Sequence, residues 1–236
     1  MSEFFRRIEK KYIITKEQYL MLKEIIENKM IEDEHGKSTI CNIYFDTGQF
    51  DLIRHSITKP VYKDKIRLRS YNIPTNNSIV YLEIKRKYKG EVSKRRSEMQ
   101  LNEFYEYMKD KNSFAKENQV RKEILYYFQF YDLKEAMFVS YYRRAYYDRN
   151  NRDFRVTFDS NIIARNYDLK LEKGIYGDNI LKNDKYIMEI KTLGAIPIWF
   201  VKILDELKIC PCGFSKYGEA YTQLVLKANS MFKCVV

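Results

Sequence analysis

The fold of this chain is decided by the stretch 65–99, which reads KIRLRSY (65–71), IVYLEIKRK (79–87) and KGEVSKRRSEM (89–99). In an extended strand, successive side chains point to opposite faces, so Arg67 and Arg69 share one face while Ile66 and Leu68 share the other. A surface strand normally turns its apolar face to the core and its charged face to water. One such strand is therefore no evidence of a binding site, and the repetition of the pattern is more informative.

The same pattern recurs along the whole chain. Glu-x-Lys occurs in a strand pattern at Glu9-x-Lys11, Glu83-x-Lys85 and Glu189-x-Lys191, and between these segments lie Arg143 in VSYYRRAYY (139–147) and Arg155 in FRVTFDS (154–160). If these strands form one closed antiparallel barrel with their charges pointing inward, the interior is a wet, charged tunnel. Such a tunnel suits a linear polyanion together with a divalent metal.

Eight motifs follow the order of a known family: FRRIEKKYII (5–14), IYFDT (43–47), KIRLRSY, LEIKRK with KGEVSKRR (82–96), SYYRRAY (140–146), FRVTFD (154–159), MEIK (188–191) and FSKY (214–217). On these motifs the chain resembles the VTC domain, the catalytic module of polyphosphate polymerases. It more distantly resembles the triphosphate tunnel metalloenzymes, which include CYTH-type triphosphatases. The resemblance implies an α+β fold, namely a closed antiparallel β-barrel tunnel with helices packed outside and at the C-terminal end.

The resemblance also implies a set of phosphate-binding residues. Arginine suits bidentate contacts with phosphate oxygens, and lysine suits point-charge contacts along a chain of phosphates. The family's catalytic basic residues match Lys11, Arg67, Arg69, Lys85, Lys94, Arg143, Arg155 and Lys216. Further substrate-binding positions match Arg96, Tyr141, Lys191 and Ser215. The match after Gly90 can slip by one residue, which would make Arg95 the inward residue, but strand alternation with Arg96 favours Lys94.

A metal site is implied by the same resemblance. Glu189 matches the family's metal-binding glutamate, and a carboxylate on Mn²⁺ or Mg²⁺ that bridges phosphate oxygens is physically sensible. Glu9, Glu83 and Glu98 are weaker candidates. For these three, salt bridges that hold the lysines and arginines in place are the preferred interpretation.

The function implied is a metal-dependent polyphosphate polymerase that transfers the γ-phosphate of ATP to a growing polyphosphate chain. One alternative is hydrolytic: the same tunnel would position water, giving an inorganic triphosphatase or polyphosphatase acting on tripolyphosphate or polyphosphate. Another is a non-catalytic binder of polyphosphate or RNA. Nucleic acid is disfavoured, because glutamates facing the ligand would repel its backbone unless a metal intervenes.

Composition agrees with a well-folded protein that has an anionic partner. The 236 residues are 45% hydrophobic and 32% charged, with a formal net charge of +11, which predicts one domain over 1–236 and an anionic ligand. No run approaches the roughly 18 apolar residues of a membrane span, and no signal peptide is evident. We therefore expect a cytoplasmic protein; a membrane-protein partner is left open. Reduced thiols are expected at Cys41, Cys210, Cys212 and Cys234.

Local patterns predict most helices and strands. Thr15 to Gln18 reads as a capping box that opens a helix, and the polar run 32–37 with Gly36 reads as a loop before a strand at 39–45. Strands are further predicted at 79–87 and 92–99 as a pair, at 137–147 and 153–159, and at 186–192. Helices are predicted at 102–109, at 120–131, and twice beyond Pro197.

Overall fold

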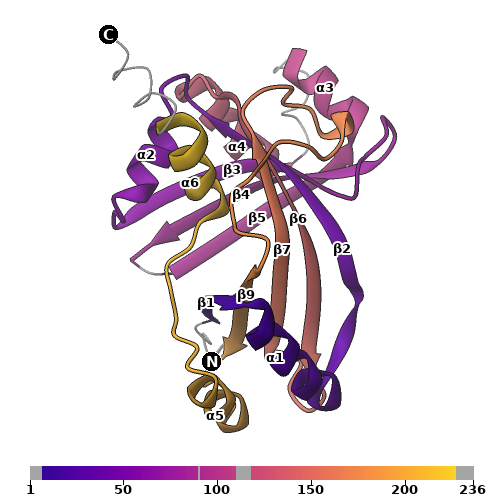
Figure 1. Ribbon diagram of the computed structural model, residues 1–236. Helices are drawn as coiled ribbons and strands as arrows, with labels where there is room; N and C mark the ends of the chain where they lie inside the picture. Colours follow the sequence, from indigo (N-terminus) through magenta and orange to yellow (C-terminus); the bar gives the residue numbers. More distant parts are fainter. Residues whose placement is uncertain (1–6, 90, 110–117, 227–236) are drawn as a thin grey trace, which may run out of the picture. The chain divides into compact units, whose positions relative to one another are not determined.

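The computed structural model describes residues 7–89, 91–109 and 118–226. Three positions named above, Phe5, Gly90 and Cys234, lie outside these ranges. The strands are β1 (Arg7–Thr15), β2 (Met30–Asp46), β3 (Tyr62–Tyr71), β4 (Ile79–Tyr88), β5 (Glu91–Gln100), β6 (Lys134–Asp148), β7 (Arg155–Arg165), β8 (Asp178–Asn179) and β9 (Lys185–Leu193). The helices are α1 (Lys16–Lys29), α2 (Asp51–Ile57), α3 (Leu101–Lys109), α4 (Gln119–Phe130), α5 (Ile198–Glu206) and α6 (Lys216–Tyr221), with short turns η1 (Leu171–Lys173) and η2 (Thr222–Leu226). Figure 1 labels the longer elements, and in the described ranges no helix is long and apolar enough to cross a lipid bilayer.

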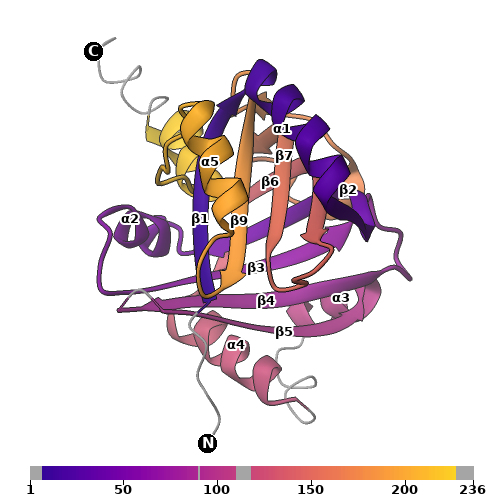
Figure 2. The ribbon, with the colours of Figure 1, turned by 90° about the horizontal axis from the view of Figure 1, so that it is seen from below.

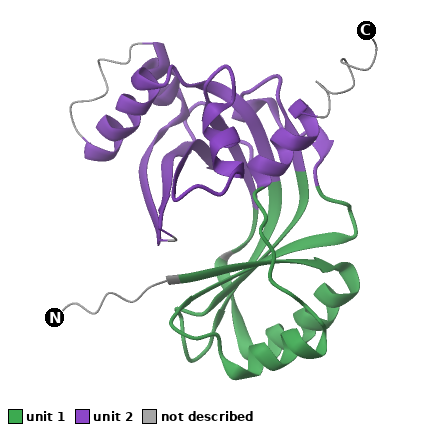
Figure 3. Cartoon of the chain, turned by 90° about the vertical axis from the view of Figure 1, so that its left-hand side faces the viewer, with its two compact units in different colours: residues 1–38, 141–162, 181–215 green, residues 39–140, 163–180, 216–236 purple. Residues whose placement is uncertain are grey.

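Two compact units divide the chain (Figure 3). Unit 1 comprises residues 1–38, 141–162 and 181–215, and unit 2 comprises residues 39–140, 163–180 and 216–236. Strands β2, β6 and β7 contribute residues to both units. The single domain expected over 1–236 stays a prediction.

Unit 1 is a sheet with helices on one face. Its strand order is β1-β9-β7-β6-β2, and β9 is antiparallel to both β1 and β7. Apolar side chains on one face of β1, β9 and β7 pack against α1 and α5 (Figure 2). The central members of this core are Tyr12, Ile14, Tyr19, Leu22, Ile26, Phe158, Met188, Phe200 and Ile203.

Helix α1 begins where the sequence predicts. The Thr15 hydroxyl accepts a hydrogen bond from the Gln18 backbone N–H, and the Gln18 side chain accepts one from the Thr15 backbone N–H. This capping box satisfies N–H groups that have no partner inside the first turn. Tyr19, Leu22 and Ile26 are buried at helical spacing, so they form the apolar side of the helix.

Unit 2 is a sheet with its own core. Its strand order is β7-β6-β2-β3-β4-β5, with β8 paired to β7. Strands β4 and β5 form the predicted antiparallel pair, in a register that runs from Ile79 opposite Gln100 to Tyr88 opposite Glu91. Ile66 and Leu68 share a core with residues of α3 and α4, and Figure 2 shows both helices beside β4 and β5. The core includes Ile43, Phe45, Ile66, Leu68, Leu82, Ile84, Phe104, Ile124 and Phe128.

One predicted loop is wrong. The polar run 32–37 belongs to the long strand β2. Gly36 is buried there, and a Cβ at this position would clash with the Glu32 side chain and would lie 2.5 Å from the Asp33 carbonyl oxygen of the same strand. Glycine is therefore required by the local path of the β2 backbone. Glu32 accepts hydrogen bonds from the Arg144 guanidinium, at 3.1 and 3.2 Å, which satisfies its charge within the strand.

The predicted fold class is confirmed only in its coarser part. The pairs β1–β9, β7–β9, β7–β8, β2–β3, β3–β4 and β4–β5 are antiparallel and the helices are segregated onto sheet faces, which makes the chain an antiparallel, β-rich α+β protein. In each unit the strand order has two ends: β1 and β2 in unit 1, β7 and β5 in unit 2. Among the described residues, closure of the sheet into a barrel is therefore not confirmed.

Candidate functional site

The charged face of unit 2 is organised around the buried carboxylate of Glu83. Its side chain is 1% exposed, and three cations surround it. Arg67 contacts Glu83 Oε2 through both Nε and Nη2 at 2.7 Å, Lys94 Nζ lies 2.5 Å from Oε1, and Arg69 Nε lies 3.7 Å from Oε2. Three cations around one anion leave this cluster with a net positive charge, which favours an anionic ligand.

Neighbouring polar groups fix the two arginines. Arg67 Nη1 donates to the Tyr44 hydroxyl at 3.1 Å, and Arg69 Nε donates to Asn42 Oδ1 at 3.0 Å. The Tyr44 ring stacks on the Tyr217 ring, with their centroids 4.6 Å apart. Orienting a guanidinium before the ligand arrives reduces the entropy lost on binding.

Tyr217 connects two of the motifs found in the sequence. Its hydroxyl donates to the buried carboxylate of Asp46 at 2.8 Å. Asp46 also accepts from the backbone N–H groups of Thr47, Leu52 and Ile53, and so holds the start of α2. IYFDT and FSKY therefore meet in unit 2, and the contact places Lys216 at the first turn of α6 beside Tyr217.

The pKa values of the cluster follow from its charges. Burial raises the pKa of Glu83, but Arg67, Arg69 and Lys94 outweigh this effect and lower it to about 2. Burial and the neighbouring Arg69 and Arg67 lower the pKa of Lys94 to about 8, against the opposing attraction of Glu83. Glu83 is therefore ionised at neutral pH, while Lys94 loses its charge in the mildly alkaline range.

Strand register decides which basic residues share this face. Lys85 of β4 lies opposite Lys65 of β3 on one side and Lys94 of β5 on the other. Like charges directly across a sheet repel one another, so a row of three lysines favours a bound anion. Arg96 lies opposite Glu83, with its guanidinium 4.7 Å from the Tyr81 ring centroid.

Arg95 belongs to the opposite face. Its Nη1 donates to Glu123 Oε2 on α4 at 2.6 Å, and Glu123 also accepts from Arg86 at 2.9 Å. Lys94, rather than Arg95, therefore shares the face of Glu83. The ion pairs of Arg86 and Arg95 attach α4 to the sheet.

Unit 1 brings the other predicted residues together in rows across three strands. Lys11 of β1 pairs in register with Glu189 of β9, which pairs with Thr157 of β7. In the neighbouring row, Glu9 pairs with Lys191, which pairs with Arg155. Because Val156 and Ile190, which lie between these rows, belong to the core, the rows lie on the face away from α1 and α5.

Glu189 is the most surrounded carboxylate of this face. It is 7% exposed, with Lys191 Nζ at 3.4 Å and Arg143 Nη2 at 3.8 Å. Burial raises its pKa, but Lys191, Lys11, a side-chain hydrogen bond with Glu9 and Arg143 together hold the pKa well below its ordinary value. Glu189 is therefore an anion at neutral pH.

Arg143 has a second carboxylate partner. Its Nε and Nη2 contact the two oxygens of Asp159 at 2.6 and 2.8 Å, a bidentate pair. Asp159 is fully buried, and the Arg143 guanidinium lies 5.2 Å from the ring centroid of Tyr141. Because one side of its fork is held by Asp159, Arg143 is fixed in position beside Glu189.

The segment before α6 borders this face. The Lys11 ammonium donates to the Phe214 carbonyl at 3.1 Å, and the Cys212 N–H donates to the Lys11 carbonyl at 2.8 Å. These contacts bring the half-buried Ser215 close to β1. Arg155, at the edge of the rows, pairs with Asp33 of β2.

A divalent cation of the kind implied by the resemblance fits unit 1. Mg²⁺ and Mn²⁺ prefer oxygen ligands, and Mg²⁺ is commonly held by one or two carboxylates, with water and substrate phosphates completing its shell. Glu189 and Glu9 lie in adjacent rows of the same face, and these two carboxylates are the oxygen donors that the face offers to such a cation beside Lys11, Lys191 and Arg143. In the described ranges, no group of three or more His, Cys, Asp or Glu side chains has a metal-binding arrangement. A metal role for Glu83 stays a prediction, and its contacts given above are all with cations.

Several residues of these faces were missed by sequence reasoning. Asp159 and Lys65 were detectable, because alternation in FRVTFD and KIRLRSY places them on the faces of Arg155 and Arg67. Thr157 lies on the same face as Arg155, but it is uncharged, so the pattern of charges does not identify it. Asp33 lies in the run 32–37, which the sequence predicts to be a loop, and no sequence pattern identifies Asn42.

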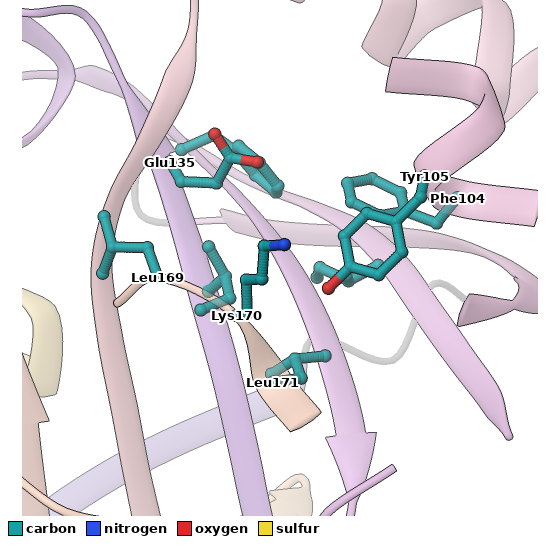
Figure 4. A pocket seen from close by; sticks show the side chains of 9 residues that line it. Phe104, Tyr105, Glu135, Leu169, Lys170 and Leu171 are labelled. Atoms are coloured by element: carbon teal, nitrogen blue, oxygen red, sulfur yellow. The ribbon is translucent and has the colours of Figure 1, made fainter. Parts of the chain in front are cut away.

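A small pocket elsewhere in unit 2 is not a candidate phosphate-binding site (Figure 4). Its free volume is about 10 Å³, room for about one water molecule. The lining is mainly apolar, from Ile43, Phe45, Leu68, Phe104, Tyr105, Leu169 and Leu171, with Glu135 and Lys170 as its charged members. None of the residues predicted above to bind phosphate or metal lines it.

Comparison with known proteins identifies a family and a fold. The family model described as the VTC domain matches residues 6–225. No curated protein matches the chain significantly. A protein from Bacillus halodurans, provisionally named an adenylate cyclase, has a TM-score of 0.55 and 16% sequence identity, with 89% of this chain and 94% of that chain covered. A similarly named protein from Vibrio parahaemolyticus has a TM-score of 0.49 and 10% identity, with 91% and 97% covered. The Bacillus structure shares the fold of this chain.

Proposed function

Because the chain belongs to the VTC domain family, we propose that it is a metal-dependent polyphosphate polymerase. The γ-phosphoryl group of ATP is transferred to the terminal oxygen of a polyphosphate chain. The bond between the γ-phosphorus and the oxygen that bridges it to the β-phosphate breaks, a new P–O bond forms, and ADP leaves. ATP and polyphosphate are then its partners, and the cytoplasmic location expected from the sequence is part of this proposal.

The observation that supports this proposal most is the excess of cations around Glu83. Arg67, Arg69 and Lys94 converge on one carboxylate, and the lysine row that includes Lys85 adds further positive charge. Phosphoryl transfer asks a protein mainly for positioning and for neutralisation of charge. We assign these residues to the binding of phosphoryl oxygens, with Glu83 as the group that holds their side chains in place.

The residues of unit 1 are assigned to the cation and to the charge around it. Glu189, with Glu9, would hold Mn²⁺ or Mg²⁺, which supplies charge neutralisation to phosphate oxygens when bound. Lys11, Lys191 and Arg143 keep Glu189 ionised and so ready to bind a cation. Arg155, Tyr141, Ser215 and Lys216 stay predicted substrate contacts, and the closed tunnel implied by the family stays part of this proposal.

Hydrolysis is the alternative chemistry for the same residues. Polymerase and hydrolase differ only in the acceptor, which is a polyphosphate oxygen in one case and water in the other. We favour the polymerase because VTC-type motifs such as SYYRRAY and FSKY outnumber the generic tunnel motifs in this sequence. A non-catalytic binder would keep its phosphate affinity without metal and without turnover.

The proposal is tested by following phosphorus in solution. The purified protein is incubated with ATP and Mn²⁺, and separately with tripolyphosphate and Mn²⁺, while ³¹P NMR records the products. Growth of the internal-phosphate signal together with ADP is expected. Orthophosphate alone would make the protein a hydrolase, and unchanged spectra would contradict both enzymatic activities.

A charge-matched pair of variants provides the control. Arg67→Ala with Arg69→Ala removes two arginines of the Glu83 cluster, whereas Arg54→Ala with Arg149→Ala removes two exposed arginines. Only the first pair is expected to abolish turnover, and circular dichroism checks that both remain folded. Equal losses in the two pairs would show that net charge, rather than this cluster, drives the reaction.

A further inference from the structure

The hydroxyl of Thr157 is buried without a hydrogen-bond partner among the described residues. The residue is 6% exposed. Buried hydroxyl groups in native proteins are nearly always hydrogen-bonded, because an unpaired one loses its water without compensation. The Tyr146 hydroxyl is also buried without a partner, but it lies in the apolar core of unit 1, so it is the charged surroundings of Thr157 that point to a ligand.

The position of Thr157 narrows the kind of ligand. It lies on β7 directly opposite Glu189 of β9, and Lys11 lies on the other side of Glu189. Facing residues in an antiparallel pair have their Cβ atoms roughly 5 Å apart. The hydroxyl thus belongs to the charged face that also carries Glu9, rather than to the core beside Phe158.

We propose that Thr157 Oγ1 is a third oxygen ligand of the divalent cation held by Glu189 and Glu9. This inference rests on the proposed function, because it requires that Glu189 binds a cation. A hydroxyl beside two carboxylates gives a set of three hard oxygens, which suits Mn²⁺ or Mg²⁺. A phosphoryl oxygen is the less favourable occupant of this position, because the adjacent Glu189 carboxylate would repel it.

The test measures Mn²⁺ binding directly, without nucleotide or turnover. Free Mn²⁺ is followed by electron paramagnetic resonance as each protein is titrated into it. Thr157→Val keeps the size and branching of the side chain but removes the oxygen, and it is expected to weaken Mn²⁺ binding roughly tenfold. Thr157→Ser keeps the hydroxyl and is expected to bind within about twofold of the unmodified protein.

A thermal melt without metal separates ligation from stability. Because its hydroxyl has no partner in the metal-free protein, Thr157→Val is expected to melt at the same temperature or higher. A markedly lower melting temperature would indicate a structural hydrogen bond and would overturn the inference. Equal weakening of Mn²⁺ binding by valine and serine would overturn it as well, because the hydroxyl would then not be the cause.

Glu189→Gln distinguishes failure of this inference from failure of the proposed metal site. If Glu189→Gln loses Mn²⁺ affinity while Thr157→Val binds as tightly as the unmodified protein, the carboxylate site stands and the role of Thr157 is overturned. If Glu189→Gln also binds normally, the proposed metal site itself fails.

Discussion

Glu83 and Glu189 occupy the same motif, Glu-x-Lys in an antiparallel strand, but they have different surroundings. Glu83 contacts three cations, and the lysine row beside it adds more positive charge. Glu189 also lies among cations, yet Glu9 lies in the adjacent row of the same face, and Arg143 is shared with Asp159. Three cations therefore surround one carboxylate in unit 2, whereas three carboxylates accompany Lys11, Lys191 and Arg143 in unit 1.

This difference shows that the neighbours in register, rather than the motif, set the chemistry of a strand glutamate. An excess of fixed positive charge binds anions, so the Glu83 cluster suits phosphate. Adjacent carboxylates and an unpaired hydroxyl bind a hard cation, so the Glu189 face suits a divalent metal. Phosphate affinity and metal affinity are then expected to be separable by mutation.

The largest expected effect comes from removing both arginines of the Glu83 cluster. A hydrogen bond to a charged group contributes about 1.5–3 kcal/mol, so Arg67→Ala with Arg69→Ala is expected to weaken tripolyphosphate binding by at least about 100-fold. Isothermal titration calorimetry measures this loss. Mn²⁺ binding without phosphate should be unchanged, and a parallel loss of Mn²⁺ affinity would show that the two functions cannot be separated.

The second effect concerns stability. Glu83→Gln leaves three cations without their anion, which is expected to cost about 3 kcal/mol of unfolding free energy, measured by urea denaturation. Glu189→Gln is expected to cost less than half as much, because Arg143 keeps its bidentate contact with Asp159. Equal costs would remove the distinction between the two glutamates.

Acid titration provides an independent control for Glu83. Its pKa is about 2 in the folded protein, below the ordinary value near 4.5, so the stabilisation is present above pH 4.5 and is lost as the pH falls toward 2. The difference corresponds to about 3 kcal/mol. Glu83→Gln should flatten the dependence of stability on pH in this window.

A smaller effect is expected at Tyr217. Tyr217→Phe keeps the ring stacked on Tyr44 but removes the hydrogen bond to Asp46, at an expected cost of about 1.5 kcal/mol in unfolding free energy. Since Tyr44 also accepts from Arg67, tripolyphosphate affinity should fall a few-fold. An unchanged affinity in calorimetry would show that Arg67 does not depend on this stack.

The smallest effect is the pH dependence of phosphate binding. Lys94 is protonated below its pKa of about 8 and neutral above it, so tripolyphosphate affinity should fall roughly threefold between pH 7 and 9. Lys94→Arg keeps its charge over this range and should remove the decrease. If the decrease persists in the arginine variant, another group is responsible.

The sequence predicts features that depend on neighbouring residues along the chain. Alternation correctly placed Arg67 and Ile66 on opposite faces of their strand, and the helix begins at the capping box of Thr15, as expected. Sequence reasoning failed where the partners of a residue come from distant strands. Asp33 meets its partner Arg155 only 122 residues later in the chain, and the relevance of Thr157 depends on its register with Glu189.

The contacts of the C-terminal segment have a consequence for how the protein is made. Lys11 bonds to the carbonyl of Phe214, 203 residues later, and Asp46 bonds to Tyr217, 171 residues later. Contacts between residues this far apart close large loops and form late in folding. On the ribosome, β1 and β2 emerge long before these partners exist. The contacts at Lys11 and Asp46 therefore form only after Phe214 and Tyr217 have been synthesised, and a chain that stops before them cannot make these contacts.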